Sequence, residues 1–357
     1  MNHFAEIRNQ LPAYELDAML LTCEANRFYA SGFSSTGTDG VAIGTREETY
    51  YFTDFRYIEA ANRIVRDARI EMTGHDRDYY TLLNEVIERH HLKNVGYEDE
   101  YMTVADWRSY ESKLRCTLVP ATKLLRALRA VKDDAELEAL TSAQRIAERA
   151  LEEIYNDVRP GATEKEIAAR LTYLMLHYGA ENVSFDPIVV SGANGSMPHG
   201  VPGEKQIRPG EFVTMDFGCI YHGYCSDMTR TVAVGHVTEE MDTVYHTVLK
   251  AQLAGIAAAH AGVAGQAIDG AARQVIVDAG YGQYFGHSFG HGVGVEIHES
   301  PNASPTFTAE LPAGAVISAE PGIYIPDKFG VRIEDVIILR DDHCDIITQA
   351  PKKLLIL

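Results

Sequence analysis

The sequence has little positive charge and no long apolar run, and both shortages narrow what the protein can bind. Its 357 residues include 32 lysines and arginines against 51 aspartates and glutamates, which gives a formal net charge of −19 at pH 7. Nucleic acids and anionic membranes are bound through clustered basic residues. No apolar run approaches the roughly 18 residues of a membrane span. We therefore expect neither a nucleic acid nor a membrane among its partners.

Cysteine is also scarce. The five cysteines are an odd number in a long chain and none form C-x-x-C, which is typical of reduced, buried thiols. The opening residues lack a basic segment followed by an apolar one, so we expect no signal peptide. These features predict a cytoplasmic protein.

The length and the pattern of apolar residues predict two domains. A chain of this length exceeds what one hydrophobic core usually holds. Short apolar strands alternate with amphipathic helices over residues 1–123, without a glycine-rich nucleotide fingerprint. We expect a small α/β domain there, a linker at 124–132 and a second domain of mixed helices and strands at 133–357.

Two helices should open the second domain. Apolar residues recur at helical spacing from Ala135 onward, which predicts a long helix. Thr163 and Glu166 have the spacing of a capping box and predict the start of another helix. Further helices are expected near 239–261 and 266–279.

Acidic residues interrupt the most apolar strands of this domain. In "EFVTMDFGCIYHGYCSDMTRTVAVG" (211–235), Asp216 and Asp227 stand among apolar neighbours. If the hairpin turn is centred between Tyr221 and His222, the two carboxylates lie directly opposite, with Cβ atoms about 5 Å apart. Ionised carboxylates that close repel each other, so they share a proton or enclose cations. The alternative is that one of them caps a turn in a different register.

The last strands repeat the pattern. Glu320 interrupts the apolar stretch "GAVISAEPGIYI", and Glu334 interrupts "GVRIEDVIILR". A salt bridge to Arg332 would neutralise one acid but not four. Four inward-facing acids therefore predict a site that binds positive charge.

The stretch "GHSFGHGVGVEIHE" (286–299) supplies the nitrogen ligand. His287, His291 or His298 could each complete the site, because four carboxylates and one imidazole can hold two divalent ions. Oxygen-rich ligation of this kind suits Mn²⁺ or Co²⁺, with Zn²⁺ also possible.

The same stretch permits a different chemistry. Its first residues fit G-x-S-x-G around Ser288, the elbow that presents a nucleophilic serine. That elbow requires a helix after the serine, and the alternate glycines that follow disfavour one. The zinc-protease motif H-E-x-x-H is absent, which excludes that mononuclear arrangement. We favour the site with two metal ions.

Several motifs, in the same order, resemble the proline-specific metallopeptidases of the pita-bread fold, namely the Xaa-Pro aminopeptidases and the Xaa-Pro dipeptidases (prolidases). The motifs are "ANRFYASGF" (25–33), "FTDFRY" (52–57), "SFDPIVVSGANGSMPHG" (184–200), "MDFG" (215–218), "CSDMTRT" (225–231), "HSFGHGVGVEIHE" (287–299), "AEPGIY" (319–324) and "VRIEDV" (331–336). The resemblance spans essentially the whole chain. It implies an α+β fold in which a small creatinase-like α/β domain precedes a pita-bread catalytic domain, and it implies a homodimer.

The resemblance also assigns the metal ligands. It implies that two divalent ions, Mn²⁺ foremost, are held by Asp216, Asp227, His291, Glu320 and Glu334. Asp227 and Glu334 would bridge the two ions. Glu320 would also accept and relay a proton during hydrolysis of the bond between an N-terminal residue and proline by a metal-activated water.

Further residues receive roles in the same way. His199 and His298 would hold the substrate and stabilise developing charge, with His287 close by. Arg332 would support the bridging acids. Together these residues imply an exopeptidase whose substrate is a peptide with proline in second position.

The length of the substrate is less firmly indicated. We expect the proline ring to lie among Phe185, Tyr221 and His298. Many prolidases carry an arginine after the H-E-x-P segment, where this sequence has Asn302. This difference favours an Xaa-Pro aminopeptidase that accepts longer peptides over a strict dipeptidase, which remains the alternative. A non-peptidase relative of the same fold is less favoured, because the five-ligand set is retained.

Overall fold

The computed structural model describes residues 2–37 and 39–357, and the chain divides into two compact units, Met1–Arg129 and Ala130–Leu357. Helix α6 (Thr122–Ala130) occupies most of the segment expected as a linker, 124–132. None of the described helices combines the length and the apolar character that crossing a membrane requires.

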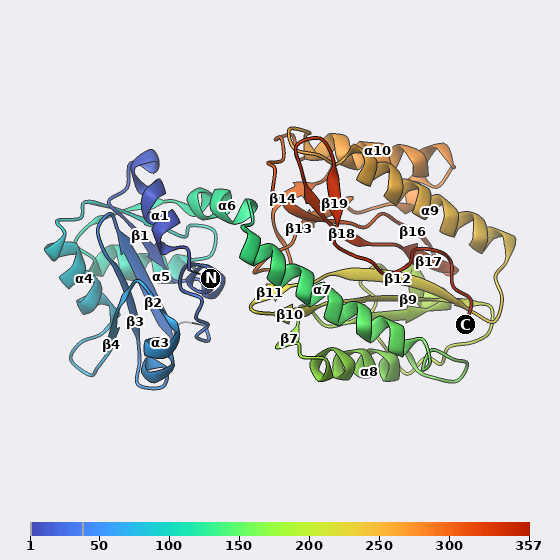
Figure 1. Cartoon of the computed structure of the whole chain (residues 1–357), viewed down its shortest axis with the longest axis horizontal. Coiled ribbons are helices and arrows are strands. Elements are labelled where there is room, and N and C mark those ends of the chain that lie inside the picture. Colours follow the sequence, from blue (N-terminus) through green and yellow to red (C-terminus); the bar gives the residue numbers. More distant parts are fainter. Residues whose placement is uncertain (1, 38) are drawn as a thin grey trace. The chain divides into compact units, whose positions relative to one another are not determined.

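Unit 1 is built on a six-stranded sheet in the order β4-β3-β2-β1-β5-β6, of which Figure 1 labels β1 to β4. Along β1, Ala18 and Leu20 face one hydrophobic cluster, whereas Met19 and Leu21 face another. Both faces of this strand are therefore buried, which explains its unbroken apolar sequence. The strands are β1 (Ala18–Leu21), β2 (Gly40–Thr45), β3 (Thr49–Thr53), β4 (Arg69–Met72), β5 (Asn94–Tyr97) and β6 (Thr117–Pro120).

Helices cover both faces of the sheet in unit 1. Apolar residues of α4 and α5 pack on one face, and those of α1, α2, α3 and α6 pack on the other. The bounds of the first five helices are α1 (Phe4–Gln10), α2 (Glu24–Ser31), α3 (Ile58–Ile64), α4 (Tyr79–Arg89) and α5 (Val104–Lys113).

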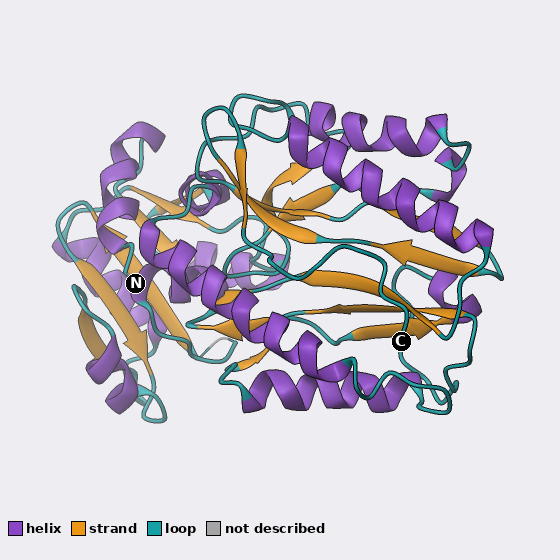
Figure 2. Cartoon of the chain, turned by 45° about the vertical axis from the view of Figure 1, so that its right-hand side comes forward, coloured by secondary structure: helices purple, strands orange, loops and turns teal. Residues whose placement is uncertain are grey.

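Unit 2 consists of antiparallel strands between two pairs of helices (Figures 1 and 2). Helices α7 and α8 share a hydrophobic cluster with β9 and β12, and helices α9 and α10 share another with β15 to β18. All four helices lie where the sequence predicts them: α7 (Asp134–Ile154), α8 (Glu164–His177), α9 (Glu239–Ala258) and α10 (Gly265–Asp278).

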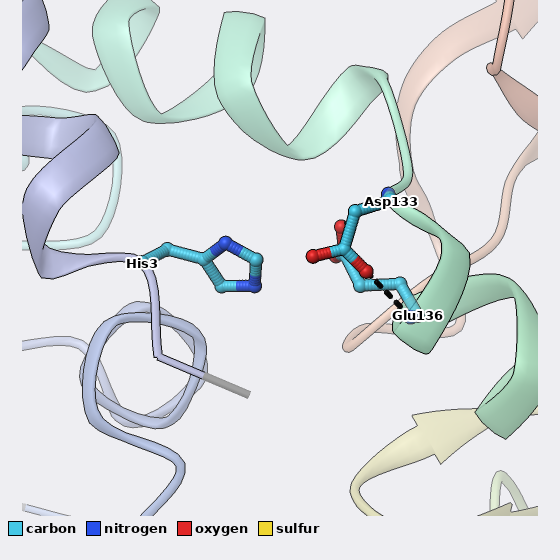
Figure 3. Close-up of side chains that lie close together, drawn as sticks. All are labelled: His3, Asp133 and Glu136. Atoms are coloured by element: carbon cyan, nitrogen blue, oxygen red, sulfur yellow. Dashed lines mark hydrogen bonds between the residues drawn. The ribbon is translucent and has the colours of Figure 1, made fainter. Parts of the chain in front are cut away.

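Capping boxes begin the first helix pair. The predicted box of α8 is confirmed, since the Thr163 hydroxyl accepts from the Glu166 N–H at 3.1 Å and Glu166 accepts from the Thr163 N–H at 2.8 Å. Asp133 and Glu136 do the same for α7, with both hydrogen bonds at 2.8 Å; Figure 3 draws the two side chains. Each box satisfies two backbone N–H groups that a helix start leaves unpaired.

The strands of unit 2 form short ladders: β12-β9-β8, β11-β10-β7, β14-β13-β15-β18-β19 and β16-β17. Mixed helices and antiparallel strands confirm the predicted α+β class. The strands are β7 (Asn182–Val183), β8 (Ile188–Ser191), β9 (Glu211–Phe217), β10 (Cys219–Tyr221), β11 (Tyr224–Cys225), β12 (Met228–Val234), β13 (Gly290–Gly292), β14 (Glu299–Ala303), β15 (Val316–Ala319), β16 (Gly322–Ile325), β17 (Phe329–Arg332), β18 (Asp335–Leu339) and β19 (Cys344–Ile346).

Candidate metal centre and active-site cavity

One cavity of unit 2, about 620 Å³ in volume, brings the candidate site residues together. All nine residues that the sequence analysis assigned as metal ligands or catalytic residues line this cavity: His199, Asp216, Asp227, His287, His291, His298, Glu320, Arg332 and Glu334. Phe185 also lines it. Tyr221 is not among the lining residues, so the expectation that it flanks the proline ring is wrong. It lies in β10, one residue before the hairpin turn.

The register of the first acid pair differs from the prediction. Asp216 on β9 pairs with Thr229 on β12, so it does not face Asp227. The turn is centred one residue later than expected, between His222 (φ 49°) and Gly223 (φ 75°). A two-residue loop with both φ values positive suits a hairpin because its twist matches that of the strands. The partner of Asp216 therefore shifts by two residues. Asp227 lies between β11 and β12, and both carboxylates line the cavity.

The second acid pair lies where two other ladders break. β15 and β18 end their pairing at Ala319 and Asp335, and β16 and β17 begin theirs at Gly322 and Arg332. The two ladders have the same register. If that register is continued through the unpaired residues between the ladders, Glu320 lies opposite Glu334. Their side chains are free of the alternation that strands impose, and both line the cavity.

His291 on β13 presents one nitrogen to these acids. Its Nδ1 lies 3.1 Å from the carbonyl oxygen of Gly292 and therefore carries a proton. Its Nε2 lies 3.2 Å from Glu320 Oε1 and 3.5 Å from Asp227 Oδ2. A histidine that ligates a metal typically donates its other N–H to a carbonyl or carboxylate in this way.

The acids carry more negative charge than the described residues around them compensate. Burial, reinforced by neighbouring carboxylates, raises the pKa of Asp227 and of Glu334 well above the usual range. Burial also raises the pKa of Asp216, although Arg332 opposes it. The buried Oδ1 atom of Asp216 has no hydrogen-bond partner in the described part of the chain. These groups favour a bound cation, or bound protons in its place.

Glu320 and His291 form an ion pair inside the cluster. Burial raises the pKa of Glu320, but the hydrogen bond from His291 and its charge outweigh burial and lower that pKa to about 2. Burial lowers the pKa of His291, but the hydrogen bond to Glu320 and the nearby acids raise it to about 9. The imidazolium thus supplies positive charge that a divalent ion would supply instead.

The geometry fits such an ion. One ligand atom each from Asp227, His291 and Glu334 lies within 4.8 Å of the others. Carboxylate oxygens with one imidazole nitrogen are a donor set for divalent ions. Asp216 and Glu320 add two further carboxylates to the same cavity.

Arg332 connects Asp216 to His287 through Tyr324. Its Nη2 donates to Asp216 Oδ2 at 2.6 Å, and its Nη1 donates to the Tyr324 hydroxyl at 2.9 Å. That hydroxyl lies 2.8 Å from His287 Nε2, while His287 Nδ1 lies 2.9 Å from the carbonyl of Ser288. Burial lowers the pKa of His287, so the ring is neutral, protonated at Nδ1, and accepts at Nε2. Both of its nitrogens are engaged by the protein.

His199 and His298 lie at the exposed part of the cavity wall. The rings of His298 and His291 are 4.3 Å apart and nearly perpendicular. Burial and the charge of His291 lower the pKa of His298, so this ring is neutral at pH 7.

Glu164, at the start of α8, anchors the loop 192–203 that carries His199. Its Oε1 accepts from the N–H of Ser191 at 2.7 Å, and its carboxylate accepts twice from the Asn194 amide at 3.1 Å. Its Oε2 accepts from the N–H of Gly203 at 3.3 Å. A fully buried carboxylate therefore ties both ends of the loop to one helix.

Sequence reasoning did not assign a role to Glu164, Tyr324 or Thr229. Tyr324 and Thr229 lie inside the quoted motifs, which was the available signal. The Thr229 hydroxyl donates to Glu334 Oε2 at 2.6 Å. Glu164 stood inside the predicted capping box, where an acid is ordinary, so no local pattern pointed to its anchoring role.

Comparison with known proteins agrees with this architecture. This chain is 40% identical to the Bacillus subtilis peptidase YqhT over 353 residues, an alignment that covers 99% of both chains. The structure of this chain is similar to that of an Xaa-Pro dipeptidase from Bacillus anthracis (TM-score 0.94, 38% identity, 99% of both chains). It is also similar to an X-Pro aminopeptidase from Thermotoga maritima (TM-score 0.90, 35% identity, 96% of this chain and 98% of that chain).

Fold and cavity define a hydrolase of the metallopeptidase class, with a creatinase-like α/β domain before a pita-bread domain. The chain belongs to metallopeptidase family M24, whose model matches residues 138–341. The model of the creatinase/prolidase N-terminal domain matches residues 4–131. The predicted family and fold are thus confirmed.

Proposed function

We propose that this protein is a metal-dependent exopeptidase that hydrolyses the bond between an N-terminal residue and proline. One observation supports this proposal most strongly: a single cavity brings together Asp216, Asp227, His291, Glu320 and Glu334, and the described residues pair the charges of these acids incompletely. The names of the Bacillus anthracis and Thermotoga maritima relatives indicate the proline-specific substrate.

The five proposed ligands would hold two divalent ions. They are Asp216, Asp227, His291, Glu320 and Glu334. Mn²⁺ suits this oxygen-rich set best, and Co²⁺ or Zn²⁺ are alternatives. Bound ions would lower the pKa of a water and polarise the scissile carbonyl.

The residues around the ligands position the substrate and move protons. Glu320 would accept a proton from the attacking water and pass it on, because its carboxylate lines the cavity beside the other proposed ligands. His199 and the neutral His298 face the open part of the cavity and would stabilise charge that develops on the carbonyl oxygen. Arg332 fixes the carboxylate of Asp216.

His287 has a supporting role in this proposal. Tyr324 and the Ser288 carbonyl engage both of its ring nitrogens. The ring therefore fills the cavity wall and holds Tyr324 against Arg332, and it need not exchange protons with the substrate.

An aminopeptidase on Xaa-Pro peptides longer than two residues is favoured over a strict dipeptidase. A dipeptidase must bind the carboxylate of the terminal proline, ordinarily through a positive group. Arg332 is the sole lysine or arginine among the described lining residues, and its guanidinium is already bound to Asp216 and Tyr324. Asn302, which also lines the cavity, is uncharged. The dipeptidase alternative is supported by the Bacillus anthracis relative.

A comparison of Xaa-Pro with Xaa-Pro-Yaa peptides tests the proposal. We expect purified protein loaded with Mn²⁺ to cleave both, with the higher kcat/KM on the longer peptide, and to lose activity on chelation. Cleavage of the dipeptide alone would establish the dipeptidase. No cleavage of either by metal-loaded protein would favour a non-peptidase relative of this fold.

Further proposals concern the domains, the oligomeric state and the location of the protein. We propose that residues 133–357 form the catalytic domain, that 1–123 is non-catalytic and that the protein is a homodimer, as the family resemblance implies; size-exclusion chromatography with light scattering tests the last point. A reducing, cytoplasmic location is supported by five free cysteines. Burial raises the pKa of Cys116, Cys219 and Cys344 to about 11, so these thiols are protonated and unreactive.

A further inference from the structure

Two buried charged residues of the quoted motifs are absent from the proposed ligand set, Arg230 of "CSDMTRT" and Asp335 of "VRIEDV". Arg230 is 2% exposed. Its Nη1 donates to the backbone carbonyls of Thr229, at 2.9 Å, and of Glu334. Its Nη2 donates to Asp335 Oδ1 at 2.8 Å. One guanidinium therefore holds both strands at the point where Glu334 projects into the cavity.

Residues 350–352 complete the arrangement from the other side. Arg230 Nη2 donates to the Ala350 carbonyl at 2.6 Å, and Nε donates to the Pro351 carbonyl at 3.0 Å. Lys352 Nζ lies 2.6 Å from Asp335 Oδ2, which also accepts from Gln252 at 2.9 Å. We call Arg230, Asp335 and residues 350–352 the clamp.

The clamp acts where ladder pairing is missing. Glu334 falls between the end of β17 and the start of β18, so no strand neighbour fixes its backbone in the ladder of either sheet. Its N–H donates to the Thr229 carbonyl at 3.1 Å, and its carboxylate accepts from the Thr229 hydroxyl. Arg230 donates hydrogen bonds to the carbonyl oxygens of both residues. Thr229 therefore holds the Glu334 carboxylate directly, and the clamp fixes the backbone of both residues through their carbonyl groups.

Stability alone does not account for such a cluster. Two cations and one carboxylate are taken from water, and buried ion pairs often stabilise a fold no better than apolar residues of similar size. A planar guanidinium with all three nitrogens bound nevertheless fixes geometry closely. Groups that orient a metal ligand commonly govern metal affinity.

We propose that the clamp is a positioning device for the metal site: Arg230, held by Asp335 and residues 350–352, sets the orientation of Glu334 toward a bound divalent ion. This inference rests on the proposed function, because it takes Glu334 to be a ligand. Arg230 is not among the described residues that line the cavity, so it would touch neither the substrate nor the reacting atoms.

The test uses Arg230→Lys, Lys352→Met and two controls in the full-length protein. Lys353→Met changes the exposed neighbour of Lys352. Thr238→Ala removes the N-cap of α9, fourteen residues before the Gln252 contact with Asp335, and destabilises the same unit. The readouts are Co²⁺ and Mn²⁺ affinity by calorimetry, the visible absorption spectrum of the Co²⁺ form, and Tm.

We expect Arg230→Lys to weaken metal binding by about 10- to 100-fold and to alter the Co²⁺ spectrum. Lys352→Met should change metal affinity and the Co²⁺ spectrum in the same direction but by a smaller amount. Lys352→Arg, which keeps the positive charge, should have the metal affinity and spectrum of the wild type. Lys353→Met should behave as wild type, and Thr238→Ala should lower Tm with metal affinity unchanged.

Two outcomes separate the inference from the proposed function. If Lys352→Met and a folded Arg230→Lys lower Tm yet bind metal with wild-type affinity and spectrum, the clamp is merely structural and the inference is wrong. If the wild-type protein itself binds no divalent ion, the proposed function fails first. Should Arg230→Lys not fold, Lys352→Met and its rescue by arginine decide the question.

Discussion

His291 Nε2 lies 3.2 Å from Glu320 Oε1 while its Nδ1 faces the carbonyl of Gly292. The ring is therefore fixed at one end and directs its other nitrogen at a group of acids. A proton on Nε2 and a metal ion at that place satisfy the same acids, so protons and metal ions compete for this site. Metal content and pH should consequently have linked effects on the protein.

We expect metal-free protein to lose stability as the pH rises from about 5 to 9. In an unfolded chain carboxyl groups titrate near pH 4 and imidazole near 6.5. In the fold the pKa of Asp227 and of Glu334 is raised, and that of His291 is about 9. The stabilisation that these raised pKa values provide is complete when the pH is below the pKa of each group in the unfolded chain. It is lost as the pH rises through the pKa of the same group in the folded protein.

Thermal unfolding of chelated protein across this pH range measures the effect. Metal-loaded protein should show a flatter dependence, because bound cations replace the protons. The pKa of Glu320 is lowered to about 2, so its contribution is lost only in acid, below the range tested. A Tm of the chelated protein that rose between pH 5 and 9 would contradict the assignment.

Asp227→Asn should remove activity and stabilise the metal-free fold. The substitution deletes a proposed bridging ligand, so activity should fall by more than the roughly 10- to 100-fold typical for losing a ligand's supporting partner. It also removes one of several mutually repelling buried charges, so the free energy of unfolding of chelated protein at pH 8 should rise by on the order of 1 kcal/mol.

Metal analysis checks the loss of the ligand, and denaturant unfolding checks the free energy of unfolding. Asp278→Asn on the exposed end of α10 serves as the matched control and should change neither the metal content nor the free energy of unfolding. An Asp227→Asn protein with normal metal content and normal activity would exclude the bridging role.

Glu164→Gln should weaken catalysis through the loop that carries His199. The glutamine amide cannot accept every hydrogen bond that the carboxylate takes from Ser191, Asn194 and Gly203, and an unpaired buried donor costs about 1–3 kcal/mol. We expect kcat/KM to fall by about tenfold while metal stoichiometry stays unchanged. Glu166→Gln, two residues along α8, is the control, since a glutamine also completes a capping box. Equal losses in the two variants would show a general effect on α8.

The helices and the buried acidic residues of the site are predictable from the sequence because each is marked by a pattern of neighbouring residues. A capping box such as Thr163 and Glu166 marks a helix start within four residues, and an acid such as Asp216 inside an apolar strand is visible without any partner. The predicted register of the first hairpin is wrong because the register depends on the turn. His222 and Gly223 adopt the two positive φ values there, and His-Gly is not one of the dipeptides, such as Asn-Gly and Asp-Gly, that mark this type of turn.

Contacts between distant residues account for what the sequence could not show. Arg230 meets Ala350 across 120 positions, and Glu164 meets Gly203 across 39. Nothing in the local pattern distinguishes these buried charges from ordinary solvated ones. Tyr221 illustrates the reverse error, since an aromatic residue close to the acids in sequence proved to lie outside the cavity lining.

Ser288→Ala should leave Xaa-Pro hydrolysis within about a factor of three of wild type. Ser288 is followed by the short strand β13 (Gly290–Gly292), so the helix that a serine elbow requires is absent there. Steady-state kinetics with saturating Mn²⁺ measure the effect. An inactive variant that keeps its metal ions would revive the serine mechanism.

Asn302→Arg should shift preference toward dipeptides. Asn302 lines the cavity beside the proposed substrate site, and an arginine there could form a charge-assisted pair with the carboxylate of a terminal proline. A hydrogen bond to a charged group contributes about 1.5–3 kcal/mol, so kcat/KM for Xaa-Pro relative to Xaa-Pro-Yaa should rise by at least about tenfold. Asn302→Gln, which extends the side chain without a charge, is the control. The longer peptide has its carboxylate one residue farther out, so its own kcat/KM should rise little; an equal gain on both peptides would mean that the arginine acts on the metal site or on the peptide in general, and that position 302 does not select substrate length.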